Sequence, residues 1–297
     1  MAREKLLLLS VAILSLISSG RNCALAHEDG SNVSQTPQSL VSREQLLQAA
    51  DEALESRRFT EANDLLAQVE AHDGSVASSA TKLLRTEWLI AVERAAEAQE
   101  LLRSITDEPR FHCRIESARI VSLLQLNSLM AADAMIAGED KRCDQEPAYL
   151  RSVGRLHLAR GRPRDAVAAL DGARRLAPAE PAILGDLGVA QIAAGEPAIA
   201  IRTLSAMANG KGDLPEVRLN LDYARAMLGE KPVRALSDDD EFWSRRLQFA
   251  GLGARQDGRS ELAASLFAEA LIARPRHDDT LWKQYADAVG GRRNGEQ

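Results

Sequence analysis

The chain has 297 residues, with 37 Lys and Arg against 43 Asp and Glu, and aromatic residues make up only 4% of it. A hydrophobic content of 45% excludes disorder throughout, and the scarcity of aromatic residues argues against an all-β sandwich or barrel. The formal net charge of −6 argues against general nucleic-acid binding, which depends on a basic surface.

Residues 1–26 have the pattern of a secretory signal peptide. Two basic residues precede an apolar run at 6–17, and an Ala-Leu-Ala sequence ends at Ala26, directly before His27. A membrane-spanning helix needs about 20 apolar residues, so this run is short for an anchor. We therefore expect cleavage between Ala26 and His27, which gives a soluble mature chain in the periplasm or outside the cell.

Two alternatives for this segment stay open. The apolar run would act as a membrane anchor if it were retained, and lipidation of Cys23 would give a weak membrane association. A bacterial lipidation site has a small residue directly before the cysteine and an aliphatic one three residues before it. This chain has Asn22 and Gly20 at those positions, so it matches the pattern poorly.

The rest of the chain is predicted to be all-α. Residues 27–41 are rich in Ser, Gln and Asn and are expected to form a flexible leader. From Ser42 onward, strong helix formers carry apolar residues at intervals of three and four, as in residues 44–54. No stretch shows the sustained alternation that is typical of a strand.

The clearest pattern is an internal period of 34 residues. Proline and glycine recur at this spacing, and ordinary helices avoid both residues. The recurring residues are Pro147, Pro181 and Pro215, together with Gly161, Gly195 and Gly229 and the pair Gly154 and Gly188. A weaker series of alanines continues the pattern upstream: Ala200, Ala166, Ala132, Ala98 and, after a step of 36, Ala62.

One such unit is predicted to be a pair of antiparallel helices. Pro147 suits the first turn of a helix, and Gly161 suits the left-handed cap at its end. Pro163 then begins a second helix, which ends before Pro178. Because a single pair cannot bury its own apolar face, successive pairs must stack on one another.

These units resemble the tetratricopeptide repeat. The family has small residues at positions 8, 20 and 27 of its 34-residue unit, a bulky apolar residue at 24 and proline at 32. The matching residues are Gly154, Ala166, Leu170, Ala173 and Pro178 in the unit from Pro147, Gly188, Ala200 and Leu204 in the unit from Pro181, and Gly251, Gly258, Ala263, Phe267, Ala270 and Pro275 in the unit from Ser244. The resemblance implies a right-handed superhelical solenoid of helix pairs.

The quality of the match divides the chain into regions. Residues 147–229 hold well-matched repeats, whereas residues 42–146 hold degenerate ones whose turns lack glycine. Acidic residues interrupt the pattern within 230–243, which we expect to be a solvated linker or hinge. Residues 244–290 are expected to form a last repeat with a capping helix, and residues 291–297 a tail.

The resemblance also implies a partner-binding groove, because tetratricopeptide arrays hold a peptide or protein against the first helix of each pair. Family positions transferred to this chain give Arg151, Arg155, Leu158, Asp186, Val189, Ile192, Asn220, Tyr223 and Met227. This is an apolar floor with a few polar groups, which suits a peptide better than a metabolite. The alternative is that Arg151 and Arg155 belong to a solvated basic face.

Residues 184–204 and 214–230 are similar to repeats of the periplasmic tetratricopeptide protein of tight-adherence (Flp-type) pilus assembly, including the Val217-Arg218-Leu219-Asn220-Leu221 string. That resemblance implies a scaffold in the assembly of a surface pilus or secretion apparatus. A general periplasmic adaptor in cell-envelope biogenesis is the first alternative. A hydrolase with an unrecognised site is the second.

We expect no catalytic residues, cofactor or metal. The chain has no G-x-S-x-G sequence, Gly-rich phosphate loop or H-E-x-x-H pair. Its five histidines are scattered along the sequence. The protein is therefore predicted not to be an enzyme.

The mature chain keeps two cysteines, Cys113 and Cys143. Cys113 lies near the start of a predicted first helix and Cys143 lies just after its antiparallel partner, so both fall at the same end of the hairpin. In an oxidising compartment an even number of cysteines favours pairing. We expect a disulfide; two free buried thiols, or a metal site that includes His112, are the alternatives.

Overall fold

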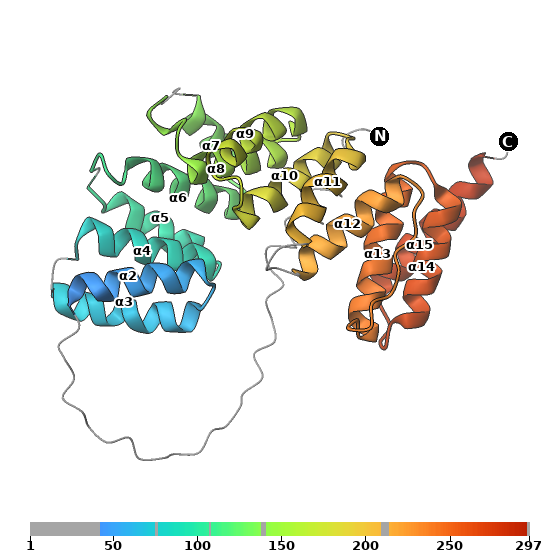
Figure 1. Ribbon diagram of the computed structural model, residues 1–297, viewed down its shortest axis with the longest axis horizontal. Coiled ribbons are helices and arrows are strands. Elements are labelled where there is room, and N and C mark those ends of the chain that lie inside the picture. Colours follow the sequence, from blue (N-terminus) through green and yellow to red (C-terminus); the bar gives the residue numbers. More distant parts are fainter. Residues whose placement is uncertain (1–41, 75–76, 107, 138–140, 209–213, 296–297) are drawn as a thin grey trace, which may run out of the picture. The chain divides into compact units, whose positions relative to one another are not determined.

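The computed structural model describes residues 42–295, apart from 75–76, 107, 138–140 and 209–213. These residues form fourteen α-helices and one short 3₁₀ turn, and they contain no strand (Figure 1). The all-α prediction is confirmed. The predicted signal peptide, its cleavage site at Ala26 and His27, Cys23 and the leader all lie outside the described residues.

The chain divides into two compact units after Ala159. The N-terminal unit contains α2 (Arg43–Glu55), α3 (Phe59–Asp73), α4 (Ser79–Ala91), α5 (Ala95–Arg103), α6 (His112–Gln125), α7 (Leu129–Ile136), the 3₁₀ turn η1 (Lys141–Cys143) and α8 (Pro147–Ala159). The C-terminal unit contains α9 (Pro163–Leu176), α10 (Pro181–Ala193), α11 (Pro197–Ala208), α12 (Pro215–Met227), α13 (Asp240–Gln256), α14 (Ser260–Ala273) and α15 (Asp279–Gly295).

A residue with a left-handed backbone recurs where one helix ends and the next begins. In the later repeats this residue is glycine, with a φ of 68° at Gly161 and of 79° at Gly195. In the degenerate region it is Arg57, Glu93 or Asn127, with φ between 53° and 63°. The spacing is 34 residues at each step from Glu93 to Gly229. The repeat therefore continues through the N-terminal unit, at the cost of a strained turn wherever glycine is absent.

The alanine series lies in the core. Each of its members has no exposed surface: Ala62, Ala98, Ala132, Ala166 and Ala200, and Ala263 of the last repeat shares this burial. A small side chain at this position allows the two helices of a pair to approach closely.

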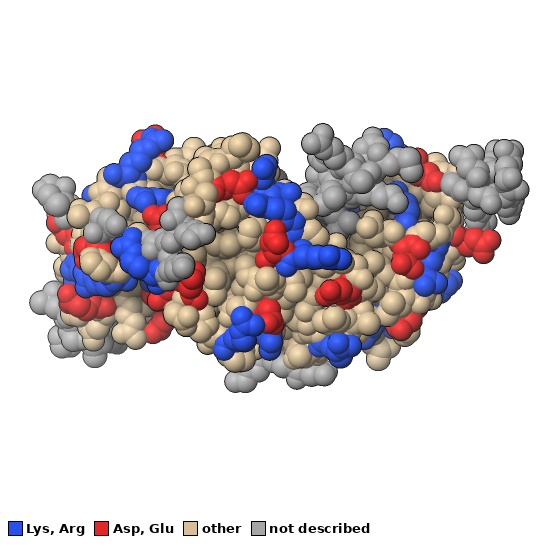
Figure 2. Space-filling view, turned by 90° about the horizontal axis from the view of Figure 1, so that it is seen from above, with Lys and Arg blue, Asp and Glu red and all other residues tan. Residues whose placement is uncertain are grey.

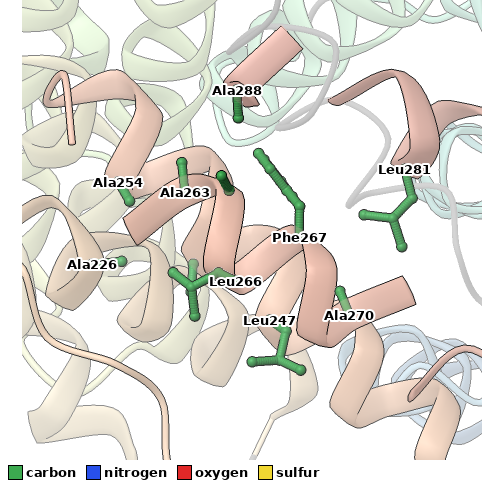
Figure 3. Close-up of a cluster of buried hydrophobic side chains, with 11 residues drawn as sticks. Ala226, Leu247, Ala254, Ala263, Leu266, Phe267, Ala270, Leu281 and Ala288 are labelled. Carbon is green, nitrogen blue, oxygen red and sulfur yellow. The ribbon is translucent and has the colours of Figure 1, made fainter. Parts of the chain in front are cut away.

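Glycine at position 8 of a repeat accepts a bulky side chain from the second helix. A Cβ atom added to Gly188 would lie 2.5 Å from the Leu204 side chain, and one added to Gly251 would lie 2.6 Å from the Phe267 ring. In the last repeat Phe267 is fully buried in a cluster of small and aliphatic side chains that includes Leu281 of α15 (Figure 3). These contacts explain why both positions require glycine.

The repeat that begins at Pro215 has a first helix, α12, but no second one. Residues 228–239, which we call the strap, are non-helical and run beside α13 and α14 (Figure 1). Helix α13 begins at Asp240, so residues 240–243 form its first turn and do not belong to a linker. The acidic residues there suit a helix start, because Asp239 caps the helix by accepting the Phe242 amide.

The strap leads the chain from the end of α12 back to its beginning, so that α12 and α13 run parallel. Arg218, in the first turn of α12, pairs at 2.9 Å with Asp238, just before α13. Further along both helices, a Cβ atom added to Gly253 would lie 2.1 Å from the Tyr223 carbonyl oxygen. Contacts therefore advance in the same direction along the two helices, as they do for successive first helices of a solenoid.

Most residues of the strap are exposed, as expected of a solvated linker, but buried ionic contacts hold it against α12 and α13. Arg246 of α13 pairs with Asp222 of α12 at 2.7 Å and with Asp238 of the strap at 2.6 Å. Both carboxylates and the guanidinium are buried. Arg246 also donates to the Val233 carbonyl, and Asp238 accepts the Ala235 amide. A buried carboxylate needs such partners, which a linker in water would not supply.

Candidate partner-binding surface

Three of the predicted groove residues lie on α8 in the N-terminal unit. Arg151, Arg155 and Leu158 are half-buried, and their spacing of four and three places them on one face of the helix. Arg151 and Arg155 both have interaction partners, so neither is a bare charge. This part of the predicted groove is a partly accessible helix face that carries both basic and aliphatic groups.

The other six predicted groove residues lie on α10 and α12 in the C-terminal unit, and the structure corrects their role. Asp186 and Asn220 are half-buried, as a contact surface requires. The four apolar residues are buried: Val189, Ile192, Tyr223 and Met227. They do not form an exposed floor, because three of them pack in a core cluster with side chains of α11 and α13. Burial also raises the pKa of Tyr223 to about 12.

An ionic cluster on the N-terminal first helices was not predicted from the sequence. Arg114 of α6 pairs with Asp51 of α2 at 2.6 Å and with Glu87 of α4. Asp51 and Glu87 each lie six residues before a left-handed turn residue, and Arg155, Val189 and Tyr223 lie six residues before theirs. The same repeat position is thus acidic on α2 and α4, apolar on α6 at Val121, basic on α8 and apolar on α10 and α12.

The cluster carries more negative than positive charge. Burial raises the pKa of Glu87 above its ordinary value, although the hydrogen bond and charge of Arg114 act in the opposite direction. The charges of Asp51 and Glu55 add to that increase. One guanidinium therefore pairs with two carboxylates, and the charge of Glu55 also acts on Glu87, so this helix face has acidic character.

A hollow of about 650 Å³ lies among α3, α4 and α5, with Trp88 and Leu89 on its lining. Its charged groups are already paired, Arg85 with Glu70 at 2.7 Å and Arg94 with Glu97 at 2.5 Å. Because each guanidinium has its own carboxylate, the hollow offers little to attract a charged ligand. It does not resemble a metabolite site.

The two cysteines are joined in the structure. The Sγ atoms of Cys113 and Cys143 are 2.11 Å apart and their Cα atoms 5.3 Å apart. Cys113 lies in the first turn of α6 and Cys143 ends the 3₁₀ turn after α7. The disulfide therefore closes the α6–α7 pair at one end, and Cys143 is fully buried beside it.

Within the described residues no group of three or more His, Cys, Asp or Glu side chains is arranged to hold a metal ion. None of the described helices is both long and apolar enough to cross a membrane. In each unit the basic and acidic side chains are interspersed on the face seen in Figure 2, and neither sign covers a broad area.

The comparisons with known proteins support the tetratricopeptide assignment. Residues 157–221 match the family model of the tetratricopeptide repeat. No curated protein has a sequence that matches this chain. None of the matches points to a catalytic family, and tetratricopeptide proteins are generally scaffolds for protein–protein interaction.

Solved structures share the fold at low sequence identity. The Cut9–Hcn1 hetero-tetramer of APC/C is 14% identical with a TM-score of 0.57 over 85% of this chain and 50% of that one. The apo form of the quorum sensor NprR from B. thuringiensis is 14% identical with a TM-score of 0.52 over 84% and 68%. The chain spans only half the length of the first. Together with the family match over residues 157–221, these structures support a tetratricopeptide-type helical solenoid, a fold that is typical of protein–protein interaction.

Proposed function

We propose that the protein is an exported, non-catalytic scaffold that binds a peptide or protein partner along the first helices of its repeats. The observation that carries this proposal is the position six residues before each left-handed turn. It places Asp51 on α2, Glu87 on α4 and Arg155 on α8, with the apolar Val121 at the same position of α6. Charges of opposite sign on the first helices of one unit can select one partner sequence and reject others.

The disulfide supports the proposed compartment. Stable disulfides persist in oxidising compartments and are rare where glutathione keeps thiols reduced. A bond between Cys113 and Cys143 therefore agrees with the signal-peptide pattern of residues 1–26. Thiol titration of denatured, non-reduced protein from the periplasmic fraction tests this point: no free thiol is expected, and two free thiols would contradict it.

We place the scaffold in the assembly of a surface pilus or secretion apparatus. The support is the similarity of residues 184–204 and 214–230 to repeats of the tight-adherence pilus protein. A general periplasmic adaptor would have the same architecture, so the captured partner decides between the two.

The test is an affinity pull-down from envelope extract. It compares the mature chain with an Arg151→Glu, Arg155→Glu variant, whose substitutions lie on half-buried positions of α8. Tyr223 is left unchanged because it is buried, and its loss would unsettle the core. A matched control, Arg164→Glu with Arg175→Glu, reverses two exposed charges on α9.

Capture of a pilus or secretion subunit by the parent and the control, but not by the α8 variant, is the expected result. Equal capture by all three proteins would place binding elsewhere and remove Arg151 and Arg155 from the site. Capture of nothing by the parent would contradict the scaffold proposal.

A further inference from the structure

The two cysteines of the disulfide differ in their access to solvent. Cys143 is fully buried, whereas Cys113 is half-buried in the first turn of α6. A thiolate opens a disulfide by attacking one of its sulfur atoms, so the rate depends on access to that atom. We therefore expect a reductant to attack the Sγ atom of Cys113 and to release Cys143.

Cys143 positions the start of α8. Its carbonyl accepts the amide of Glu146 at 3.0 Å, and the carbonyl of Glu146 accepts the amide of Leu150 at 3.1 Å. These two bonds carry the chain from η1 into the first turn of α8, directly before Arg151. The later turns are held differently, because Leu156 is fully buried in a core cluster. Release of Cys143 should thus loosen the first turn of α8 and leave the rest of the helix in place.

Cys113 lies beside the other part of the proposed binding surface. It directly precedes Arg114, which pairs with Asp51 at 2.6 Å and also with Glu87. The disulfide therefore joins the first turn of α6, with its ionic cluster, to the start of α8, with Arg151. The state of the bond sets how these two parts of the surface are held relative to each other.

A second contact spans the same junction. The Arg142 guanidinium, next to Cys143 in the chain, donates to His112 Nε2 at 3.0 Å, and His112 is next to Cys113. A cation at this place stabilises a thiolate that forms on reduction. The contact does not require the disulfide, so it keeps the two cysteines near each other and favours closure when an oxidant returns.

We propose that the Cys113–Cys143 disulfide is a redox switch of the partner-binding surface. The bond is closed in the oxidising compartment proposed above and opens where a dithiol acts on it. Opening releases η1 and the first turn of α8, and with them the Arg151 end of the surface. The switch rests on the proposed function, because it takes the first helices as the surface that binds the partner.

The dithiol supplies everything that the exchange requires. One of its thiolates bonds to Cys113 Sγ, the bond between the two cysteines breaks, and Cys143 takes the electron pair and a proton. The second thiolate of the dithiol then displaces Cys113, which takes up another proton. The protein gains two electrons and two protons, and the dithiol is oxidised to a disulfide.

Hydrogen exchange of the parent, before and after treatment with dithiothreitol in the absence of denaturant, tests the switch. The treated parent is expected to have two free thiols and an unchanged circular dichroism spectrum. The amides of Glu146 and Leu150 are expected to exchange at least about tenfold faster after reduction, because the segment that holds them opens locally. The amides of α14 are the internal reference and should exchange at the same rate in both states.

A Cys113→Ser, Cys143→Ser variant is the matched control. It is expected to exchange as the reduced parent does, and dithiothreitol should leave its rates unchanged. A bond in the parent that opens only in urea would overturn the proposal. A reduced parent whose Glu146 and Leu150 amides stay as protected as before would overturn it as well.

The same variant separates this proposal from the proposed function. In a pull-down from envelope extract without reductant, the double variant is expected to capture at least about fivefold less partner than the oxidised parent, as a coupled switch would. Equal or stronger capture by the variant would overturn the switch and leave the proposed function in place. Capture of nothing by the oxidised parent would contradict the proposed function itself, and the control of binding with it.

Discussion

Within the described residues, the α6–α7 pair has a short second helix and α12 has none, and each is completed in a different way. In the N-terminal unit, α7 has eight residues, of which Ala132 alone is buried, and the Cys113–Cys143 disulfide fastens the pair. In the C-terminal unit, α12 has no second helix, and the strap is fastened by the buried charges of Arg246 and Asp238.

The disulfide and the buried ionic contact respond differently to redox conditions and to pH. A disulfide limits the freedom of the unfolded chain, and its contribution depends on redox conditions and little on pH. An ionic contact depends on both partners staying charged and paired, because one buried charge left alone is costly. A reductant should therefore weaken the first pair, and loss of a charge should weaken the second.

The largest effect is expected from Arg246→Met, which leaves Asp222 and Asp238 buried without their shared cation. We expect a loss of about 3–5 kcal/mol in the free energy of unfolding, measured by urea denaturation. Arg175→Met is the control, because Arg175 forms an exposed pair with Asp171 that should contribute less than about 1 kcal/mol. Equal effects of the two substitutions would contradict the role given to Arg246.

Removal of the disulfide is the next largest change. The bonded cysteines are separated by 30 residues, and a loop of this size corresponds to about 2–4 kcal/mol. We expect Cys113→Ala with Cys143→Ala to lower the stability of the N-terminal unit by that amount and to leave the C-terminal unit unchanged. Proteolysis at limited protease concentration locates the loss, and cleavage confined to the C-terminal unit would be the contrary result.

A complete helix pair should lose stability when the glycine at position 8 of its repeat is substituted. In Gly251→Ala the new methyl group meets the Phe267 ring at 2.6 Å, so we expect a loss of about 1–3 kcal/mol in thermal or urea unfolding. Gly290→Ala is the matched control, because no atom lies within 4 Å of its added Cβ. Alanine is also the better helix former, so the control should be neutral or more stable than the parent.

The smallest effect concerns pH. Burial alone would raise the pKa of Asp238, but the Ala235 amide and Arg246, followed by Arg218, hold it below its ordinary value of 3.8. A carboxyl group with a lowered pKa stabilises the folded state above its unfolded pKa, and this contribution disappears as the pH falls through the folded value. The stability difference between the parent and Asp238→Asn should therefore shrink below pH 3.8.

Urea unfolding at several pH values, with Asp222→Asn as a second variant, measures this effect. Burial raises the pKa of Asp222 although Arg246 acts in the opposite direction, so the parent gains stability relative to that variant as the pH falls and the opposite trend is expected. If the stability difference between the parent and Asp238→Asn grew as the pH fell, the lowered pKa given to Asp238 would be contradicted.

The sequence predicted the complete repeats well, because their signals are local. Proline at Pro181 and glycine at Gly195 mark the ends of α10 without reference to any other part of the chain. The strap could not be predicted in this way. Asp222 stands where Gly188 and Gly251 accept a bulky side chain, and its partner Arg246 follows 24 residues later.

The proposed partner-binding surface was predicted only in part for a related reason. Family positions located the first-helix face, including Arg151 and Arg155, but not the packing of α12 against α13 that buries Tyr223 and Met227. The acidic part of the face at Asp51 was missed because its turn has Arg57 in place of glycine, which hides the period.

The central claim is that the disulfide stabilises the α6–α7 pair and the buried ionic contacts stabilise α12 and α13, each without the other. Hydrogen exchange measured by mass spectrometry, on the reduced parent and on oxidised Arg246→Met, tests it most directly. Reduction is predicted to speed exchange in α6 and α7 and to leave α12 and α13 protected, whereas Arg246→Met is predicted to do the reverse. Faster exchange in both regions from either change, or in neither, would contradict the account.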